Sequence, residues 1–181
     1  VYSFWIFLNA IMDRIYWGTG QFVLGATVGT AAVAVFAVAI YLKDMYYSFS
    51  TSISGVFLPK VTAMITTGAS EQTVSDLFIR IGRIQYIVLA YVLSAFILLG
   101  RPFIALWAGE GYDETYVIAL MFFASTLIPM IQNLGITILQ ARNEMKYRSI
   151  LILAVSAASL AAAIPAARQF GAFGVAAVTS V

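Results

Sequence analysis

The sequence has no cysteine and no histidine, and only 10% of its 181 residues are charged. Without cysteine, no disulfide framework and no thiolate metal site can form. Without histidine, the commonest general base and metal ligand is missing. An ordinary soluble domain has roughly 25% charged residues, so this chain lacks the polar residues that such a domain needs for its surface.

Apolar residues are abundant instead. Hydrophobic residues make up 62% of the chain, and its mean hydropathy is +0.94. A lipid bilayer is the natural solvent for such a sequence. The net charge of +2 is too small to suggest a nucleic-acid partner. The chain starts at Val1, shows no signal-peptide pattern, and stops at Val181 inside an apolar run. We therefore expect a fragment of a longer membrane protein.

The apolar stretches predict an all-α fold, a polytopic transmembrane helix bundle that forms a single lobe over residues 1–181. About 20 apolar residues can cross the roughly 30 Å hydrocarbon core as a helix. Five complete helices and a truncated sixth are expected, near residues 3–27, 31–64, 77–99, 116–140, 149–167 and 171–181.

Turn and capping residues predict where these helices begin and end. Thr73 and Asp76 have the spacing of a capping box at the start of the third helix. Gly100 and Pro102 are expected to stop that helix. Asp113 is expected to cap the fourth helix, and Gly171 to separate the fifth from the sixth.

Basic residues alternate between the connecting loops. The segments 60–83 and 142–148 each carry three basic residues: Lys60, Arg80 and Arg83 in the first, and Arg142, Lys146 and Arg148 in the second. The segment 101–116 and the last loop carry one each, Arg101 and Arg168. By the positive-inside rule, the two strongly basic loops are expected in the cytoplasm.

Four charges fall inside the expected spans: Asp13, Arg14, Lys43 and Asp44. At mid-membrane an ionisable residue costs on the order of 3 kcal/mol, so such residues normally face a bundle interior or a watery cavity. Helical spacing extends them into two polar stripes, one of Asn9, Asp13, Trp17 and Gln21, the other of Lys43, Tyr47, Ser50, Thr51 and Ser54. We expect both stripes to line a common cavity.

The residues leave two roles open for these charges. They can pair with each other, as Asp13 with Lys43 or Arg14 with Asp44, and only lock two helices together. Alternatively, Arg14 and Lys43 bind the phosphate of a lipid-linked substrate. Two mid-helix amides next to Pro129, Gln132 and Asn133, are candidates for sugar hydroxyls or for hydrogen bonds between helices.

Several segments resemble bacterial oligosaccharide and polysaccharide flippases, the lipid-linked-sugar branch of the superfamily that also holds the multidrug-and-toxin exporters. The matching segments, in order, are FLNAIMDRI, GVFLPKVTAMI, IRIGRIQ, GRPFIALWAGEGYDETY (residues 100–116), QNLGITILQARNEMKYRS and FGAFGVAA. The resemblance implies two six-helix lobes, of which this chain is most of the second.

By the same resemblance, the full protein flips a lipid-linked oligosaccharide, the precursor of a cell-surface polysaccharide, across the bacterial cytoplasmic membrane by alternating access. The implied partners are that substrate, membrane lipids and the first lobe of the same chain. Neither a cofactor nor a metal is expected.

Three other functions stay open. A cation-coupled multidrug exporter would have acidic cavity residues without basic partners, whereas here each membrane acid lies next to a base. A membrane-embedded glycosyl- or acyltransferase is disfavoured because His and Cys are missing and because Glu110, Asp113 and Glu114 occupy a short turn. A structural membrane subunit would leave the internal charges without a substrate.

Overall fold

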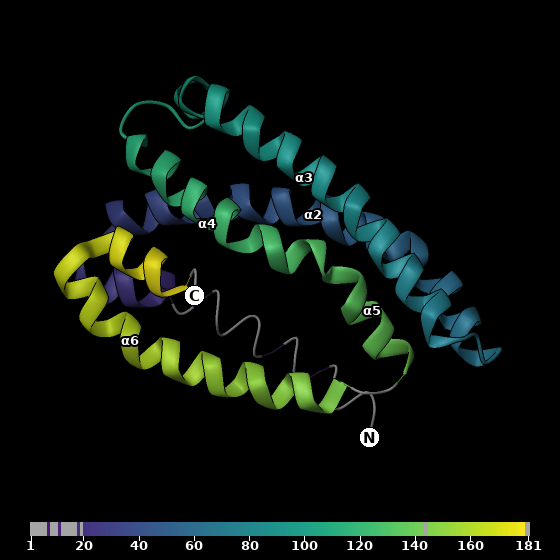
Figure 1. Cartoon of the computed structure of the whole chain (residues 1–181). Coiled ribbons are helices and arrows are strands. Elements are labelled where there is room, and N and C mark those ends of the chain that lie inside the picture. Colours follow the sequence, from purple (N-terminus) through teal and green to yellow (C-terminus); the bar gives the residue numbers. More distant parts are fainter. Residues whose placement is uncertain (1–6, 8–10, 12–17, 19, 143–144, 180–181) are drawn as a thin grey trace.

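The computed structural model describes residues 7, 11, 18, 20–142 and 145–179. Residues 20–27 are helical and lead into the longer helices (Figure 1). These are α2 (Thr30–Thr66), α3 (Glu71–Trp107), α4 (Asp113–Ile131), α5 (Asn133–Ala141) and α6 (Met145–Thr179). The described part of the chain contains no strand, which confirms the all-α prediction there. Within it, α2, α3 and α4 are long and apolar enough to cross a membrane.

Hydrogen bonds between helices show that α2 and α4 run in the same direction. The Thr115 hydroxyl donates to the Val35 carbonyl over 3.1 Å, and the Ser50 hydroxyl donates to the Met130 carbonyl over 2.6 Å. Both pairs are 80 residues apart in sequence, so the two helices stay in register over the distance from Val35 to Ser50. Helix α3 lies between them in sequence and runs the opposite way (Figure 1).

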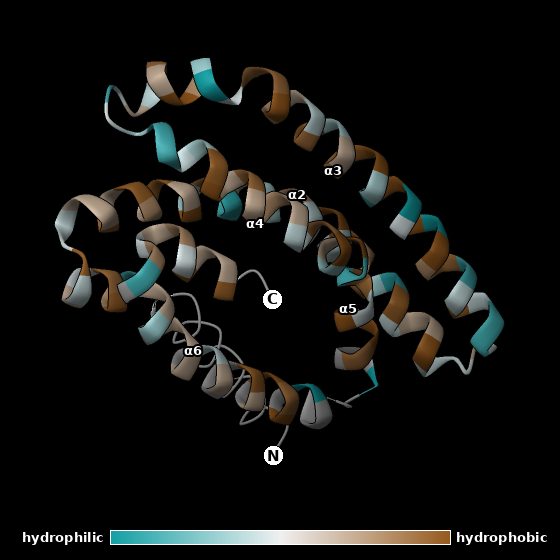
Figure 2. Cartoon of the chain, turned by 60° about the vertical axis from the view of Figure 1, so that its left-hand side comes forward, coloured by the Kyte–Doolittle hydropathy of each residue, from teal (hydrophilic) through white to brown (hydrophobic). Residues whose placement is uncertain are grey.

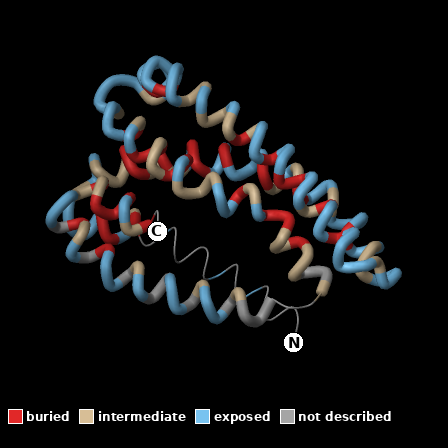
Figure 3. Tube along the Cα trace, viewed as in Figure 1, coloured by how far each residue is buried: buried red, intermediate tan, exposed pale blue. Residues whose placement is uncertain are grey.

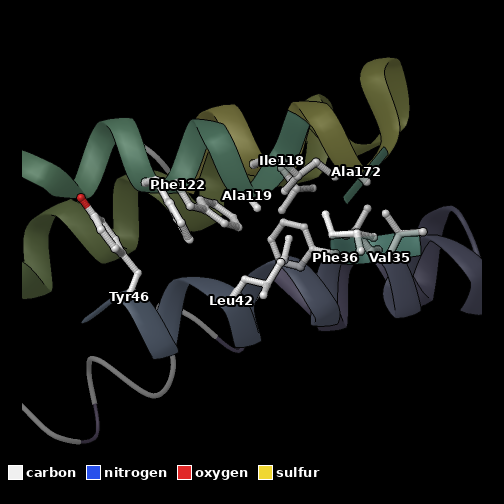
Figure 4. Packing of buried hydrophobic residues seen from close by; sticks show 14 of the residues in the cluster. Val35, Phe36, Leu42, Tyr46, Ile118, Ala119, Phe122 and Ala172 are labelled. Atoms are coloured by element: carbon white, nitrogen blue, oxygen red, sulfur yellow. The ribbon is translucent and has the colours of Figure 1, made fainter. Parts of the chain in front are cut away.

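The main hydrophobic core lies between α2, α4 and the end of α6. Phe36 meets Phe122 edge-on (Figure 4), with ring centroids 5.6 Å apart. Tyr46 stacks on Phe123 with ring centroids 4.3 Å apart. Alanines, among them Ala172 (Figure 4), and Val175 form the buried α6 side of this core. A second, smaller cluster joins α2, α3 and α5 and consists of Val61, Leu77, Ile81 and Leu134. Buried residues are thus concentrated between the helices (Figure 3).

The outward face of α3 is apolar as well. Tyr91, Leu98 and Leu106 are 75%, 78% and 90% exposed. Figure 2 shows hydrophobic residues recurring along α3, with polar residues gathered towards its start. A soluble protein rarely exposes such a continuous apolar surface. The surface of α3 therefore suits a bilayer or a second apolar protein surface.

The predicted limits of the third helix are wrong at both ends. The helix starts earlier, because Ser70 is its N-cap and the Ser70 hydroxyl oxygen accepts the Thr73 backbone N–H at 3.3 Å. It also runs through Gly100 and Pro102 to Trp107. Gly100 serves packing instead of termination: a Cβ there would lie 2.9 Å from the ring of Tyr116 on α4.

The actual turn between α3 and α4 uses two later glycines. Gly109 and Gly111 have φ angles of 88° and 92°, a conformation that glycine adopts without strain. Helix α4 then begins at Asp113, which lies in its first turn, while Tyr112 is the N-cap and makes no side-chain capping bond. The expectation that Asp113 itself caps this helix is therefore wrong, although an acid in the first turn still complements the helix dipole.

The single helix predicted for residues 116–140 is divided at Gln132 into α4 and α5. Pro129 lies one turn before this break and has no backbone N–H to continue the helical ladder. The Ser50 hydroxyl of α2 binds the carbonyl of Met130, beside the break. A proline and an external hydrogen bond together account for the interruption.

Helix α6 covers both the predicted fifth helix and the start of the predicted sixth. Gly171 has a non-helical φ of 57° inside it, so the predicted separation at this glycine is confirmed. A Cβ at Gly174 would clash with the carbonyl of Ala166, so the chain folds closely on itself here. Most of the first predicted helix, 3–27, falls outside the described residues.

Candidate functional site: a buried polar seam

Lys43 is the most deeply buried charge of the described residues, with 5% of its surface exposed. It lies about 20 Å along α2 from Thr30, at about 1.5 Å per residue. Its Nζ atom is 2.7 Å from the Oδ1 atom of Asp44, whose side chain is 61% exposed. This ion pair is formed within α2, so it does not by itself lock two helices together.

A buried hydrogen-bond network lies further along the same face of α2 as Lys43. Gln85 of α3 is fully buried, and its Nε2 atom lies 2.7 Å from the Ser54 hydroxyl. The same Nε2 lies 3.2 Å from the Ser50 carbonyl and 3.3 Å from the Ser50 hydroxyl. We call Lys43, Ser50, Ser54 and Gln85 the polar seam.

The polar seam passes between the two hydrophobic clusters and ends at the break between α4 and α5. Through the Ser50–Met130 bond it joins α2, α3 and α4. Among the described residues, the Gln85 Oε1 atom has no hydrogen-bond partner although it is buried. A buried acceptor without a partner is costly, so Oε1 lowers the net stabilisation that Gln85 contributes.

The two amides at the break have different surroundings. Asn133 is 7% exposed and begins α5. Gln132 is exposed and lines a groove of about 500 Å³ between α3 and the end of α4. The structure therefore divides the predicted pair: Asn133 belongs to the interior, and only Gln132 can reach a ligand from outside.

The structure brings together only part of the predicted site. Asn9, Asp13 and Arg14 lie outside the described residues, so the predicted pairings of Asp13 and Arg14 are not tested. Gln21 is half-buried in the helical residues 20–27. The second predicted stripe divides by burial: Lys43, Ser50 and Ser54 are buried, whereas Tyr47 is 41% exposed.

Gln85 was not among the predicted site residues. The sequence does contain a signal for it, because Ile81, Gln85 and Leu89 follow one another at intervals of four residues, and all three are buried. A glutamine at this spacing between two core residues of an apolar helix predicts a hydrogen bond between helices.

The two basic segments meet at one end of the bundle. Arg142, just after α5, places its Nη2 atom 2.9 and 2.7 Å from the two carboxylate oxygens of Glu71, the first residue of α3. The predicted basic segments 60–83 and 142–148 therefore lie at the same end of the helices. The turn from Gly109 to Gly111 lies at the opposite end of α3 (Figure 1).

The arrangement offers hydrogen bonding and a buried positive charge. Comparison with known proteins adds nothing to this, since no family model, curated protein or solved structure matches the chain.

Proposed function

We propose that this chain spans the cytoplasmic membrane of a bacterium and forms part of a transporter that flips a lipid-linked oligosaccharide. Lys43 lies next to the transport cavity and binds the phosphate or pyrophosphate of the substrate. The helices α2, α3 and α4 each cross the bilayer, and the end marked by the Glu71–Arg142 ion pair lies in the cytoplasm.

The alternating direction of the helices supports the membrane placement. Helices α2 and α4 are parallel and α3 is antiparallel to both, as expected for successive spans joined by short turns. The contact between Glu71 and Arg142 puts both basic segments at one end, which agrees with the positive-inside rule. The apolar exposed face of α3 then meets lipid.

The observation that carries the functional proposal is the burial of Lys43 in a helix that could cross a membrane. Ionisable residues at such positions are expensive and usually mark a substrate or ion pathway. A buried ammonium group on a helix face that also carries hydroxyl groups further along suits a sugar phosphate, because the cation binds the phosphate while neutral groups accept and donate hydrogen bonds.

A cation-coupled multidrug exporter is less well supported. Such a protein needs a buried acidic residue that can take up a cation, whereas the Asp44 side chain is 61% exposed. The positive member of the Lys43–Asp44 pair is the buried one, which favours an anionic ligand.

The proposal is tested by deleting the gene and comparing two phenotypes. If the chain belongs to an oligosaccharide flippase, the deletion strain accumulates the lipid-linked oligosaccharide and loses the surface glycan, and its drug sensitivity stays at the parental level. Increased sensitivity to several cationic drugs with normal surface glycan would favour the exporter and contradict the flippase.

A further inference from the structure

A groove of about 500 Å³ lies outside the polar seam, between α3 and the break that follows α4. Its α3 wall is a single helical stripe made of Phe78, Ile79, Gly82, Arg83, Tyr86 and Ile87. Its other wall is Ile131 and Gln132. The volume is in the range of roughly 300–1,000 Å³ that is typical of small-molecule sites.

The break between α4 and α5 shapes this groove. Gly82 has no side chain to fill the space, and a Cβ there would lie 3.5 Å from Ile131. Helix α4 ends at Gln132, and this residue forms part of the groove wall. The groove is thus apolar along its length and carries one cation and one amide.

Arg83 lies at the point where the exposed surface of α3 changes from charged to apolar. Asp76, Arg80 and Arg83 are exposed on the first turns of the helix. From Ile84 to Leu99 the helix then has no charge, which is about 24 Å at about 1.5 Å per residue. In the proposed membrane placement, Arg83 lies at the level of the cytoplasmic headgroups and the groove runs from there into the hydrocarbon. Tyr86, one turn deeper, is of the residue type enriched at this interface.

We propose that this groove binds an anionic glycerophospholipid of the cytoplasmic leaflet. The lipid phosphate pairs with Arg83 and hydrogen-bonds with Gln132, and one acyl chain lies against Gly82, Ile87 and Ile131. This site rests on the proposed membrane placement and is separate from the substrate cavity. Among the described residues no carboxylate forms an ion pair with Arg83, so its charge is available to a lipid.

The charge arrangement selects a lipid over a second apolar protein surface. A protein helix seated in the groove would have to cover Arg83 and supply an acid for it. An anionic phospholipid supplies both the negative charge and the apolar chain, in the order in which Arg83 and the apolar wall occur along α3. Anionic lipids are also attracted to basic residues at the cytoplasmic surface, with a preference of about fivefold for each such residue.

The test uses the purified full-length protein in vesicles of phosphatidylcholine and phosphatidylglycerol in equal amounts. After extraction in mild detergent, native mass spectrometry counts the lipids that stay bound. Phosphatidylglycerol is expected to be retained about fivefold over phosphatidylcholine. Arg83→Gln removes this preference, and Arg83→Lys keeps most of it.

Arg80→Gln is the matched control, because Arg80 is an exposed arginine one turn away on the same helix that does not line the groove. The preference is expected to survive in this variant. Equal loss in the Arg80 and Arg83 variants, or no preference in the unaltered protein, would overturn the lipid site. A protein that does not enter vesicles would overturn both this site and the membrane placement. Lipid preference without oligosaccharide transport would overturn the proposed function alone.

Discussion

The Nε2 atom of Gln85 on α3 lies 2.7 Å from the hydroxyl oxygen of Ser54 on α2, and both residues are almost fully buried. This hydrogen bond is the shortest contact that Gln85 makes in the polar seam. It joins two antiparallel helices between the two hydrophobic clusters. Interhelical hydrogen bonds of this kind contribute about 1 kcal/mol in membrane proteins, and they also fix the register in which the helices pack.

The first prediction concerns this contact. Ser54→Ala leaves the Gln85 amide with one fewer acceptor in the interior and lowers the free energy of unfolding by about 1 kcal/mol. Ser94→Ala is the control, because the exposed Ser94 hydroxyl binds only the Ala90 carbonyl of its own helix, and it changes stability by less than about 0.5 kcal/mol. Denaturant unfolding of the full-length protein in mild detergent measures both values. Equal effects of the two substitutions would show that the polar seam does not stabilise the bundle.

The second prediction compares two helical glycines. A Cβ at Gly100 would meet the Tyr116 ring at 2.9 Å, and this ring is fixed by a stack on Phe96 and a 3.0 Å hydrogen bond to the Ile97 carbonyl. Gly100→Ala is therefore expected to destabilise the protein by about 1–3 kcal/mol.

Gly55→Ala serves as its control, because no atom lies within 4 Å of a Cβ at that position. This substitution is expected to be neutral or to stabilise by about 0.5–1 kcal/mol, since alanine is the better helix former. Thermal unfolding followed by circular dichroism compares the variants. A Gly100→Ala protein as stable as the Gly55→Ala protein would mean that α3 and α4 do not pack closely there.

Much of this fold can be predicted from the hydrophobic pattern of the sequence, but the ends of its helices cannot. The long charge-free run is sufficient to predict α3, because a helix satisfies its own backbone hydrogen bonds in lipid. The run that forms α2 is a weaker signal, because it contains Lys43 and Asp44. Gly100 was predicted as a helix stop because the same residue type serves termination and close packing. Only the position of Tyr116 on another helix decides between these roles, and a single sequence does not contain that position.

The candidate site shows the same division. Lys43 could be predicted as a site residue, because a charge in an apolar helix is costly and usually has a function. The division of the 116–140 segment at Gln132 could not, because it depends on a hydrogen bond from Ser50, 80 residues earlier in the chain. Pro129 alone is compatible with a kinked but continuous helix.

The third prediction concerns membrane topology. Single cysteines at Thr67 and at Asn143, which follows Arg142 in sequence, are labelled from the cytoplasmic side, and a cysteine at Glu110 from the outside. The native chain segment has no cysteine that would interfere. This result is expected because the Glu71–Arg142 ion pair joins the first two sites at one end of the bundle. Labelling of positions 67 and 143 from opposite sides would rule out the proposed placement.

The fourth prediction separates a substrate-binding role for Lys43 from a structural one. Lys43→Gln lowers surface-glycan export about tenfold or more while the protein still accumulates, because a hydrogen bond to a charged group contributes about 1.5–3 kcal/mol. Quantitative glycan staining and immunoblotting measure export and protein level in the same cells.

A structural role gives a different outcome. Removing the base then leaves an acid without its partner, and the protein level falls together with export. Recovery of export in a neutral pair, either Lys43→Gln with Asp44→Asn or Lys43→Gln with Asp13→Asn, would contradict substrate binding by Lys43. Asp44→Asn alone serves as the control, since it keeps the buried cation.

Translocation of lipid-linked oligosaccharide by purified full-length protein in vesicles tests the central claim most directly. A fluorescent lipid-linked oligosaccharide is placed in the vesicles, and its transfer between leaflets is followed by the accessibility of the sugar to an added glycosidase. Time-dependent transfer is expected in protein-containing vesicles, and Lys43→Gln is expected to abolish it. Transfer no faster than in protein-free vesicles, with the protein correctly inserted, would contradict the central claim.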